Sequence, residues 1–102
     1  MNLQKETIKV LEENGCKQED VLYVSNEKIK TTWDNFLQIS NFGYDDGYGG
    51  AEISKSLKVV GNDFWLERHE YDGAEWWEFK KLPVDNLPEQ TFIKEELLEN
   101  YY

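Results

Sequence analysis

Carboxylates stand beside tryptophans between residues 64 and 80, a combination that could serve carbohydrate chemistry. Glu67, Glu70, Glu75 and Glu78 lie among three of the four tryptophans of the chain. Glycosidases use two carboxyl groups to cleave the glycosidic bond, and aromatic rings stack on sugar faces. With 21 acidic residues among 102, some carboxylates will be neighbours by chance, and a chain this short offers little depth for a cleft. A small hydrolase-like enzyme that uses paired carboxylates is therefore the alternative interpretation.

Nucleophilic and metal chemistry would depend on single copies of cysteine and histidine, Cys16 and His69. A thiol–imidazole pair needs hydrogen-bond contact, and Cys16 follows the predicted end of a helix, where the dipole raises the pKa of a thiol. One cysteine and one histidine do not complete a zinc site. The sequence also lacks the G-x-S-x-G and H-E-x-x-H patterns. We expect no catalytic residue, no cofactor and no metal, and we predict that the protein is not an enzyme.

A glycine-rich loop is predicted over residues 41–50, with four glycines in the last eight positions. Its paired aspartates, Asp45 and Asp46, suggest calcium, but the loop lacks the alternating oxygen ligands and the distant glutamate of an EF-hand. The same aspartates would repel phosphate, and the lysine of a P-loop is absent. We therefore assign Tyr44, Asp45, Asp46 and Tyr48 to a candidate partner-binding surface.

The elements that position these groups centre on a predicted β-hairpin. Aromatic and charged residues alternate on both sides of Asp72-Gly73, a dipeptide favoured in two-residue hairpin turns. Such a turn places His69 opposite Trp76, but it also places Glu67 opposite Glu78, which costs a few tenths of a kcal/mol. A three-residue loop would remove this repulsion and would change which side chains share a face. The sequence leaves both registers open.

With the two-residue turn, alternation along the strands divides the hairpin and the preceding strand into two faces. One face is the predicted core and collects Leu57, Val59, Phe64, Leu66, Trp77 and Phe79. The other is covered by the last segment or by a loop, or it binds a protein, since Trp and Tyr dominate interface hot spots. The candidate surface on that face comprises Trp65, Glu67, His69, Tyr71, Trp76 and Glu78.

The remaining pattern predicts a single α+β domain over residues 1–102. An amphipathic helix is expected over 3–14 with Gly15 as its left-handed stop, followed by a short strand over 21–24 at an edge of the sheet. A second helix is expected to begin near Thr31 or Thr32. A three-stranded antiparallel meander over 54–60, 64–70 and 75–81 follows, with Gly61-Asn62 or Asn62-Asp63 as its first turn. The expected order is therefore α-β-α-β-β-β, with a last helix over 91–101 or a flexible tail after Pro88.

The amino-acid composition restricts the kinds of partner that the protein can bind. The net charge of −10 disfavours direct binding to nucleic acid or to anionic membranes and permits a basic or nucleic-acid-binding protein as partner. A homodimer is also compatible with the sequence. One cysteine cannot form an internal disulfide, residues 1–6 carry no apolar signal core, and no stretch has the length of a membrane span. We therefore expect a cytoplasmic protein, most simply a small acidic binding or accessory protein.

Three stretches resemble a known group of proteins. They are YDDGYGGAE over residues 44–52, LKVV over 57–60 and WLERHEYDGAEWWEF over 65–79. They resemble small uncharacterised proteins carried by bacteriophages and by prophages of Gram-positive bacteria. The resemblance covers roughly residues 19–83. The group has no assigned activity, so the resemblance implies a bacterial cytoplasmic setting and no catalytic or binding residue.

Overall fold

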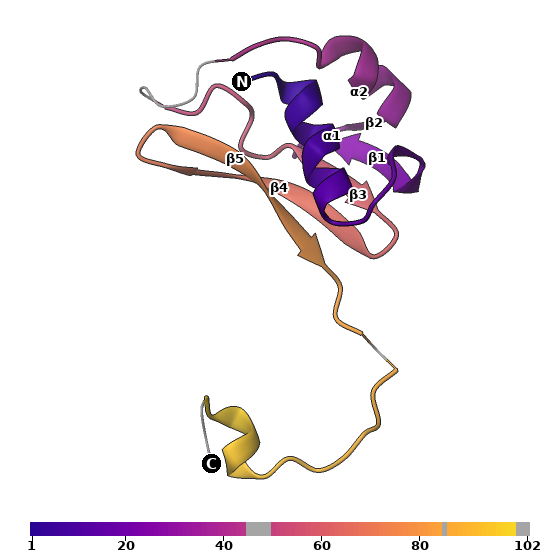
Figure 1. Cartoon of the computed structure of the whole chain (residues 1–102), viewed down its shortest axis with the longest axis vertical. Coiled ribbons are helices and arrows are strands. Elements are labelled where there is room, and N and C mark those ends of the chain that lie inside the picture. Colours follow the sequence, from indigo (N-terminus) through magenta and orange to yellow (C-terminus); the bar gives the residue numbers. More distant parts are fainter. Residues whose placement is uncertain (45–49, 85, 100–102) are drawn as a thin grey trace.

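The computed structural model describes residues 1–44, 50–84 and 86–99. Two helices lie on one side of an antiparallel five-stranded sheet with the order β2-β1-β3-β4-β5 (Figure 1), which confirms the α+β class. The elements are α1 (Leu3–Glu13), β1 (Val21–Ser25), β2 (Lys30–Thr31), α2 (Trp33–Ile39), β3 (Lys58–Gly61), β4 (Phe64–Tyr71) and β5 (Ala74–Lys81), with 3-10 turns at Gln18–Asp20 and Lys94–Leu97.

Helix α1 has defined signals at both ends. The Asn2 side chain caps it by accepting a hydrogen bond from the Lys5 N–H at 3.0 Å. At the other end Gly15 takes a φ of 73°, and the Cys16 N–H donates to the Leu11 carbonyl at 2.9 Å. This is a Schellman arrangement, in which a left-handed glycine satisfies the last carbonyls of the helix. The predicted helix over 3–14 and its glycine stop are confirmed.

The β4–β5 hairpin has the two-residue turn. Asp72 and Gly73 both take positive φ, 52° and 88°, as a primed hairpin turn requires. His69 lies opposite Trp76 and Arg68 opposite Trp77. The register that the Asp-Gly turn predicted is therefore confirmed, and the three-residue loop is excluded.

The β3–β4 turn is formed by Asn62-Asp63, one of the two predicted alternatives. Val59 pairs with Leu66 and Val60 with Trp65. Compared with a Gly61-Asn62 turn, the pairing shifts by two residues, so every side chain keeps its face. Gly61 is required here because a Cβ at this position would lie 2.0 Å from the Phe64 ring.

The early strand joins the meander at its β3 edge, as the sequence predicts, and a further short strand lies outside it. β1 pairs with β2 on one side and with β3 on the other, so β2 is the edge strand. β2 was not predicted because two residues carry no alternation that a sequence pattern could reveal. The turn before it is formed by Asn26, whose side chain accepts the N–H groups of Lys28 and Ile29 at 2.8 and 2.9 Å.

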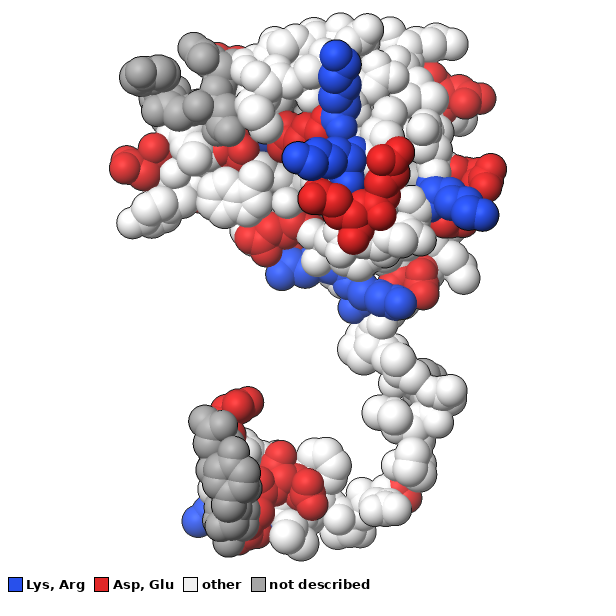
Figure 2. Space-filling view, viewed as in Figure 1, with Lys and Arg blue, Asp and Glu red and all other residues white. Residues whose placement is uncertain are grey.

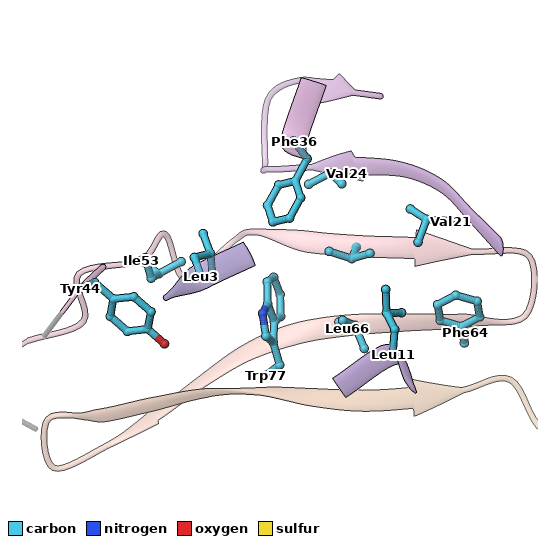
Figure 3. Packing of buried hydrophobic residues seen from close by; sticks show 11 residues of the cluster. Leu3, Leu11, Val21, Val24, Phe36, Tyr44, Ile53, Phe64, Leu66 and Trp77 are labelled. Atoms are coloured by element: carbon cyan, nitrogen blue, oxygen red, sulfur yellow. The ribbon is translucent and has the colours of Figure 1, made fainter. Parts of the chain in front are cut away.

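The core lies between the sheet and the two helices (Figure 3). Leu11 comes from α1, Phe36 from α2 and Leu66 from the centre of the sheet, and all are at most 4% exposed. Val59, Phe64 and Trp77 are also buried, while Leu57 and Phe79 pack against them partly exposed. The predicted core face is confirmed.

The segment after β5 leaves the domain (Figure 1). The predicted helix over 91–101 is reduced to the 3-10 turn Lys94–Leu97, preceded by Ile93 without a side-chain cap, and residues 100–102 lie outside the described part. A helix of this length is marginal unless its apolar face is packed, and this one is not buried against the domain. We call residues 82–84 and 86–99 the apolar arm.

Candidate functional site

The strands β4 and β5 present alternate side chains to the side of the sheet opposite the two helices. We call this side the outer face, formed by Trp65, Glu67, His69, Tyr71, Trp76, Glu78 and Lys80. In the described part of the chain no helix packs on it, since the buried residues of α1 and α2 belong to the core. Tyr71 is 77% exposed and Trp76 36% exposed. The six predicted surface residues of the hairpin therefore share one open face.

His69 joins the two glutamates of this face. Its Nε2 lies 2.6 Å from Glu67 Oε2, and its Nδ1 lies 3.4 Å from Glu78 Oε2. Glu67 and Glu78 are directly opposite each other, which by itself is repulsive. The imidazole and Lys80, whose Nζ is 3.3 Å from Glu78 Oε1, offset that repulsion. This explains why the like-charge pair does not exclude the two-residue turn.

The two tryptophans of the outer face are held by the same carboxylates. Trp65 Nε1 donates to Glu67 Oε1 at 2.7 Å, and Trp76 Nε1 donates to Glu78 Oε2 at 3.2 Å. The Trp76 ring also stacks on His69, with ring centroids 6.5 Å apart and an angle of 25° between the planes. The indole N–H groups are thus satisfied within the chain, and the rings are oriented without a partner.

These hydrogen bonds keep both glutamates ionised. Donation from Trp65 and then from His69 lowers the pKa of Glu67 below its usual value. The pKa of Glu78 is lowered by the hydrogen bond from Trp76 and further by Lys80. The outer face therefore carries two fixed negative charges between aromatic rings at neutral pH.

The opposite, inner face holds a second set of charges that sequence reasoning missed. Arg68 is 8% exposed, and its Nη2 lies 3.0 Å from Glu75 Oε1 and 3.2 Å from the Tyr44 hydroxyl. Its Nη1 lies 3.2 Å from Glu6 Oε1 on α1. We call Glu6, Tyr44, Arg68 and Glu75 the buried charge cluster.

The buried charge cluster ties together segments that are distant in sequence. Glu75 also accepts the backbone N–H groups of Glu52 and Ile53, at 2.7 and 3.1 Å. The Arg68 guanidinium lies over the Trp77 ring, 4.8 Å from its centroid. Helix α1, the hairpin and the segment before β3 are therefore connected through one arginine and one glutamate.

Tyr44 does not belong to the candidate surface to which the sequence assigned it. It is 7% exposed and sits on the inner side, where its hydroxyl donates to Glu6. Burial, together with that hydrogen bond, raises the pKa of Tyr44 to about 12. Asp45, Asp46 and Tyr48, the other predicted members from the glycine-rich loop, lie outside the described residues.

The pKa of Arg68 is raised although its burial acts to lower it. The hydrogen bonds to Tyr44 and Glu75 outweigh the loss of water around the guanidinium. One signal in the sequence could have revealed the cluster. Alternation places Arg68 on the core side with Leu66, and a buried arginine requires carboxylate partners. The contribution of Glu6, 62 residues away in sequence, had no local signal.

Cys16 lies away from the outer face and is not activated. It lines a hollow of about 360 Å³ together with Asp20, Asp63 and Phe64 at the β3–β4 turn. Burial, with the nearby charges of Asp20 and Asp63, raises the pKa of the thiol. His69 faces the other side of the sheet, so the structure does not assemble a thiol–imidazole pair.

Among the residues that the structure describes, no three metal-ligating side chains cluster to form an ion site. Within the same residues, no helix is long and apolar enough to cross a bilayer.

Comparison of the chain with protein-family models, curated proteins and solved structures found no match. The resemblance to proteins carried by bacteriophages therefore stays a prediction.

Proposed function

We propose that this chain is a small non-enzymatic binding protein that holds a basic protein partner on its outer face. The observation that carries the proposal is an open sheet face on which Trp65, Tyr71 and Trp76 stand among two ionised glutamates. Soluble proteins seldom expose several large aromatic side chains together unless the surface binds something. Trp and Tyr are also enriched at the centres of protein interfaces.

Arginine side chains of the partner fit this face best. A guanidinium stacks on an indole or phenol ring and at the same time donates two hydrogen bonds to a carboxylate. Glu67 and Glu78 each lie within hydrogen-bond distance of a tryptophan N–H, so the ring and the carboxylate that one arginine would engage are adjacent. The net charge of −10 would also speed the encounter with a basic protein. Nucleic-acid-binding proteins commonly carry such surfaces.

The titration behaviour of the outer face supports binding over catalysis. A pair of carboxylates that cleaves a glycosidic bond needs one group with a raised pKa to act as the acid. Both Glu67 and Glu78 have lowered pKa values. The face is also the open side of a sheet, where water would compete with any reacting group.

The setting that we propose is the bacterial cytoplasm. The single cysteine is compatible with a reducing compartment. The resemblance to phage-borne proteins supports a role as an accessory protein that acts on a host or phage protein.

The arginine preference is tested by titrating the protein with an octa-arginine peptide while tryptophan fluorescence and backbone amide shifts are recorded. We expect saturable binding with shifts concentrated on β4 and β5. Affinity should fall as salt is added, because the charged contacts are screened. The double variant Trp65→Ala/Tyr71→Ala should bind at least tenfold more weakly and remain folded.

The matched control is Glu12→Gln/Glu19→Gln, which removes two exposed carboxylates from α1 and from the turn after it and leaves the outer face intact. It should bind octa-arginine with nearly the affinity of the original chain. Equal losses in the aromatic and control variants would show unspecific attraction to an acidic protein and would overturn the proposal. An octa-lysine peptide that binds as tightly as octa-arginine would also argue against ring stacking.

A further inference from the structure

The apolar arm exposes large apolar side chains that its own domain does not bury. Leu87, Phe92 and Leu97 are 72%, 68% and 73% exposed, and Leu82, Val84, Ile93 and Leu98 are each at least 50% exposed. The radius of gyration is 17.3 Å, whereas a compact chain of this length has about 13 Å. Figure 1 shows the arm extending away from the sheet. An arm of this composition gains stability only when another surface covers it.

The distal half of the arm combines this apolar character with negative charge (Figure 2). Residues 86–99 contain four acidic side chains, Glu89, Glu95, Glu96 and Glu99, against the single base Lys94. The turn Lys94–Leu97 brings two of these acids close to Ile93 and Leu97 in sequence. A matching surface would be an apolar groove with a basic rim.

The domain itself carries such a groove between α1 and β5. The groove has a volume of about 410 Å³, and its apolar lining includes Met1, Val10 and the edge of Trp77. Lys5 and Lys9 also line it, and both are exposed. Neither lysine forms an ion pair with any residue that the structure describes.

The remaining charges of the groove do not cancel this basic rim. The carboxylate of Glu6 is held by Arg68, and Glu13 stands at the far end of the helix. The amino group of Met1 donates to the Tyr44 carbonyl at 3.2 Å and adds positive charge at the near end. The middle of the groove is therefore apolar and basic, complementary to the distal half of the arm.

We propose that the apolar arm of one copy docks in the α1–β5 groove of a second copy, with its glutamates against Lys5 and Lys9. The described parts of the arm extend away from the domain from which the arm departs and leave its own groove uncovered (Figure 1). A neighbouring molecule is therefore the occupant that we propose for the groove. Because each copy donates an arm and receives one, the exchange closes as a two-fold dimer.

This dimer is independent of the proposed outer-face function. The groove lies on the α1 side of β5, and the outer face lies on the other side of the sheet. Trp76 lines the groove and also belongs to the outer face. It is therefore left unchanged in the tests of both proposals, so that the failure of one is distinguishable from the failure of the other.

Sedimentation equilibrium of the full chain, over a hundredfold range of concentration, tests the exchange. We expect the mass to rise from 12.1 kDa to twice that value. Ile93→Ser/Leu97→Ser should shift the dissociation constant at least tenfold upward by removing apolar side chains from the arm. Lys5→Glu/Lys9→Glu should do the same by reversing the rim of the groove.

A charge exchange makes the test specific. Adding Glu95→Lys/Glu96→Lys to the Lys5→Glu/Lys9→Glu variant should restore the dimer, because opposite charges again face each other. The matched control, Lys17→Glu/Lys28→Glu, reverses two exposed lysines that do not line the groove, and it should dimerise like the original chain.

Three results would overturn the proposal. They are a monomer at every concentration, a dimer that survives Ile93→Ser/Leu97→Ser, and a charge exchange that fails to restore association. A monomer whose Trp77 environment changes when the arm is removed after Lys81 would show docking within one chain, which also contradicts exchange between copies.

Discussion

The two faces of the sheet carry the same residue types, but on one face they are buried and on the other they are exposed to solvent. On the inner face Arg68 and Glu75 pair beside Trp77, all three at most 8% exposed. On the outer face His69 bridges Glu67 and Glu78 beside Trp76, which is exposed. One strand pair thus builds a buried ion network and an exposed one, and they are separated only by the alternation of its side chains.

The comparison teaches how surroundings decide what a charge does. Charges withdrawn from water must be fully paired, and removing one partner of a buried pair leaves the other uncompensated. Charges on an open face interact weakly with each other and stay available to a partner. The inner network therefore stabilises the fold, whereas the exposed charges of the outer network remain accessible to a binding partner.

The largest difference between the faces is expected from removing one cation from each. Arg68→Met leaves Glu75 and Glu6 buried without their common partner, and it should lower the free energy of unfolding by about 3–5 kcal/mol. Lys80→Met on the outer face should lower it by less than about 1 kcal/mol. Urea denaturation followed by circular dichroism measures both. Equal losses would show that the inner pair is not desolvated.

Gly61→Ala tests how tightly the inner face is packed beside Phe64. The added methyl would collide with the Phe64 ring, which is stacked on Phe79 at 5.6 Å and cannot move aside freely. We expect a loss of about 1–3 kcal/mol in the free energy of unfolding. The neighbouring variant Asn62→Ala, at an exposed position of the same turn, should lose less. Thermal unfolding measures both variants. Equal losses would show that the turn geometry, and not the collision with Phe64, determines the loss of stability.

Alkaline titration probes the inner face. The pKa of Tyr44 is about 12 in the folded chain against an ordinary value of 10.0. Between these two values the unfolded chain releases this proton while the folded chain retains it, so stability falls as the pH rises from 10 toward 12. Tyr44→Phe should flatten this part of the stability curve. The absorbance of tyrosinate should also show one late-titrating phenol that is missing in the variant.

The smallest effect is expected in acid, on the outer face. The pKa of Glu67 is lowered by the hydrogen bonds from Trp65 and His69, so its contribution is present above the pKa of an unfolded glutamate and is lost as the pH falls through the folded value. Glu67→Gln should reduce the slope of stability against pH only slightly, because solvent screens the site. The side-chain carbon shift of Glu67 reports the titration directly. A pKa above the ordinary value would contradict the hydrogen-bond network.

The hairpin could be predicted because its signals are local. Asp72-Gly73 selects the turn, the turn fixes the register, and alternation then assigns Trp77 to the core and Trp65 to the outer face. The β3–β4 turn shows the same robustness, since its two alternative positions differ by two residues and preserve the faces. Helix α1 was predictable for a similar reason, from its apolar stripe and Gly15.

What could not be predicted depends on contacts between distant residues or on very short elements. The sequence places Tyr44 in a loop surface, whereas in the structure it is buried through its contacts with Glu6 and Arg68. β2 pairs with β1 over two residues only, which is too short for any sequence pattern to reveal the strand. The segment over 91–101 has apolar residues in rough helical spacing, but those that the structure describes, Phe92, Ile93 and Leu97, are all exposed.

The alternation of β4 and β5 also has a practical consequence for protein engineering. Outward positions such as Trp65 and Tyr71 are held by a scaffold whose stability comes from the opposite side. A library randomised only at those positions would vary recognition and leave the folding determinants of the hairpin unaltered. The small domain could in this way serve as a framework for selecting new binders, with a sheet surface in place of variable loops.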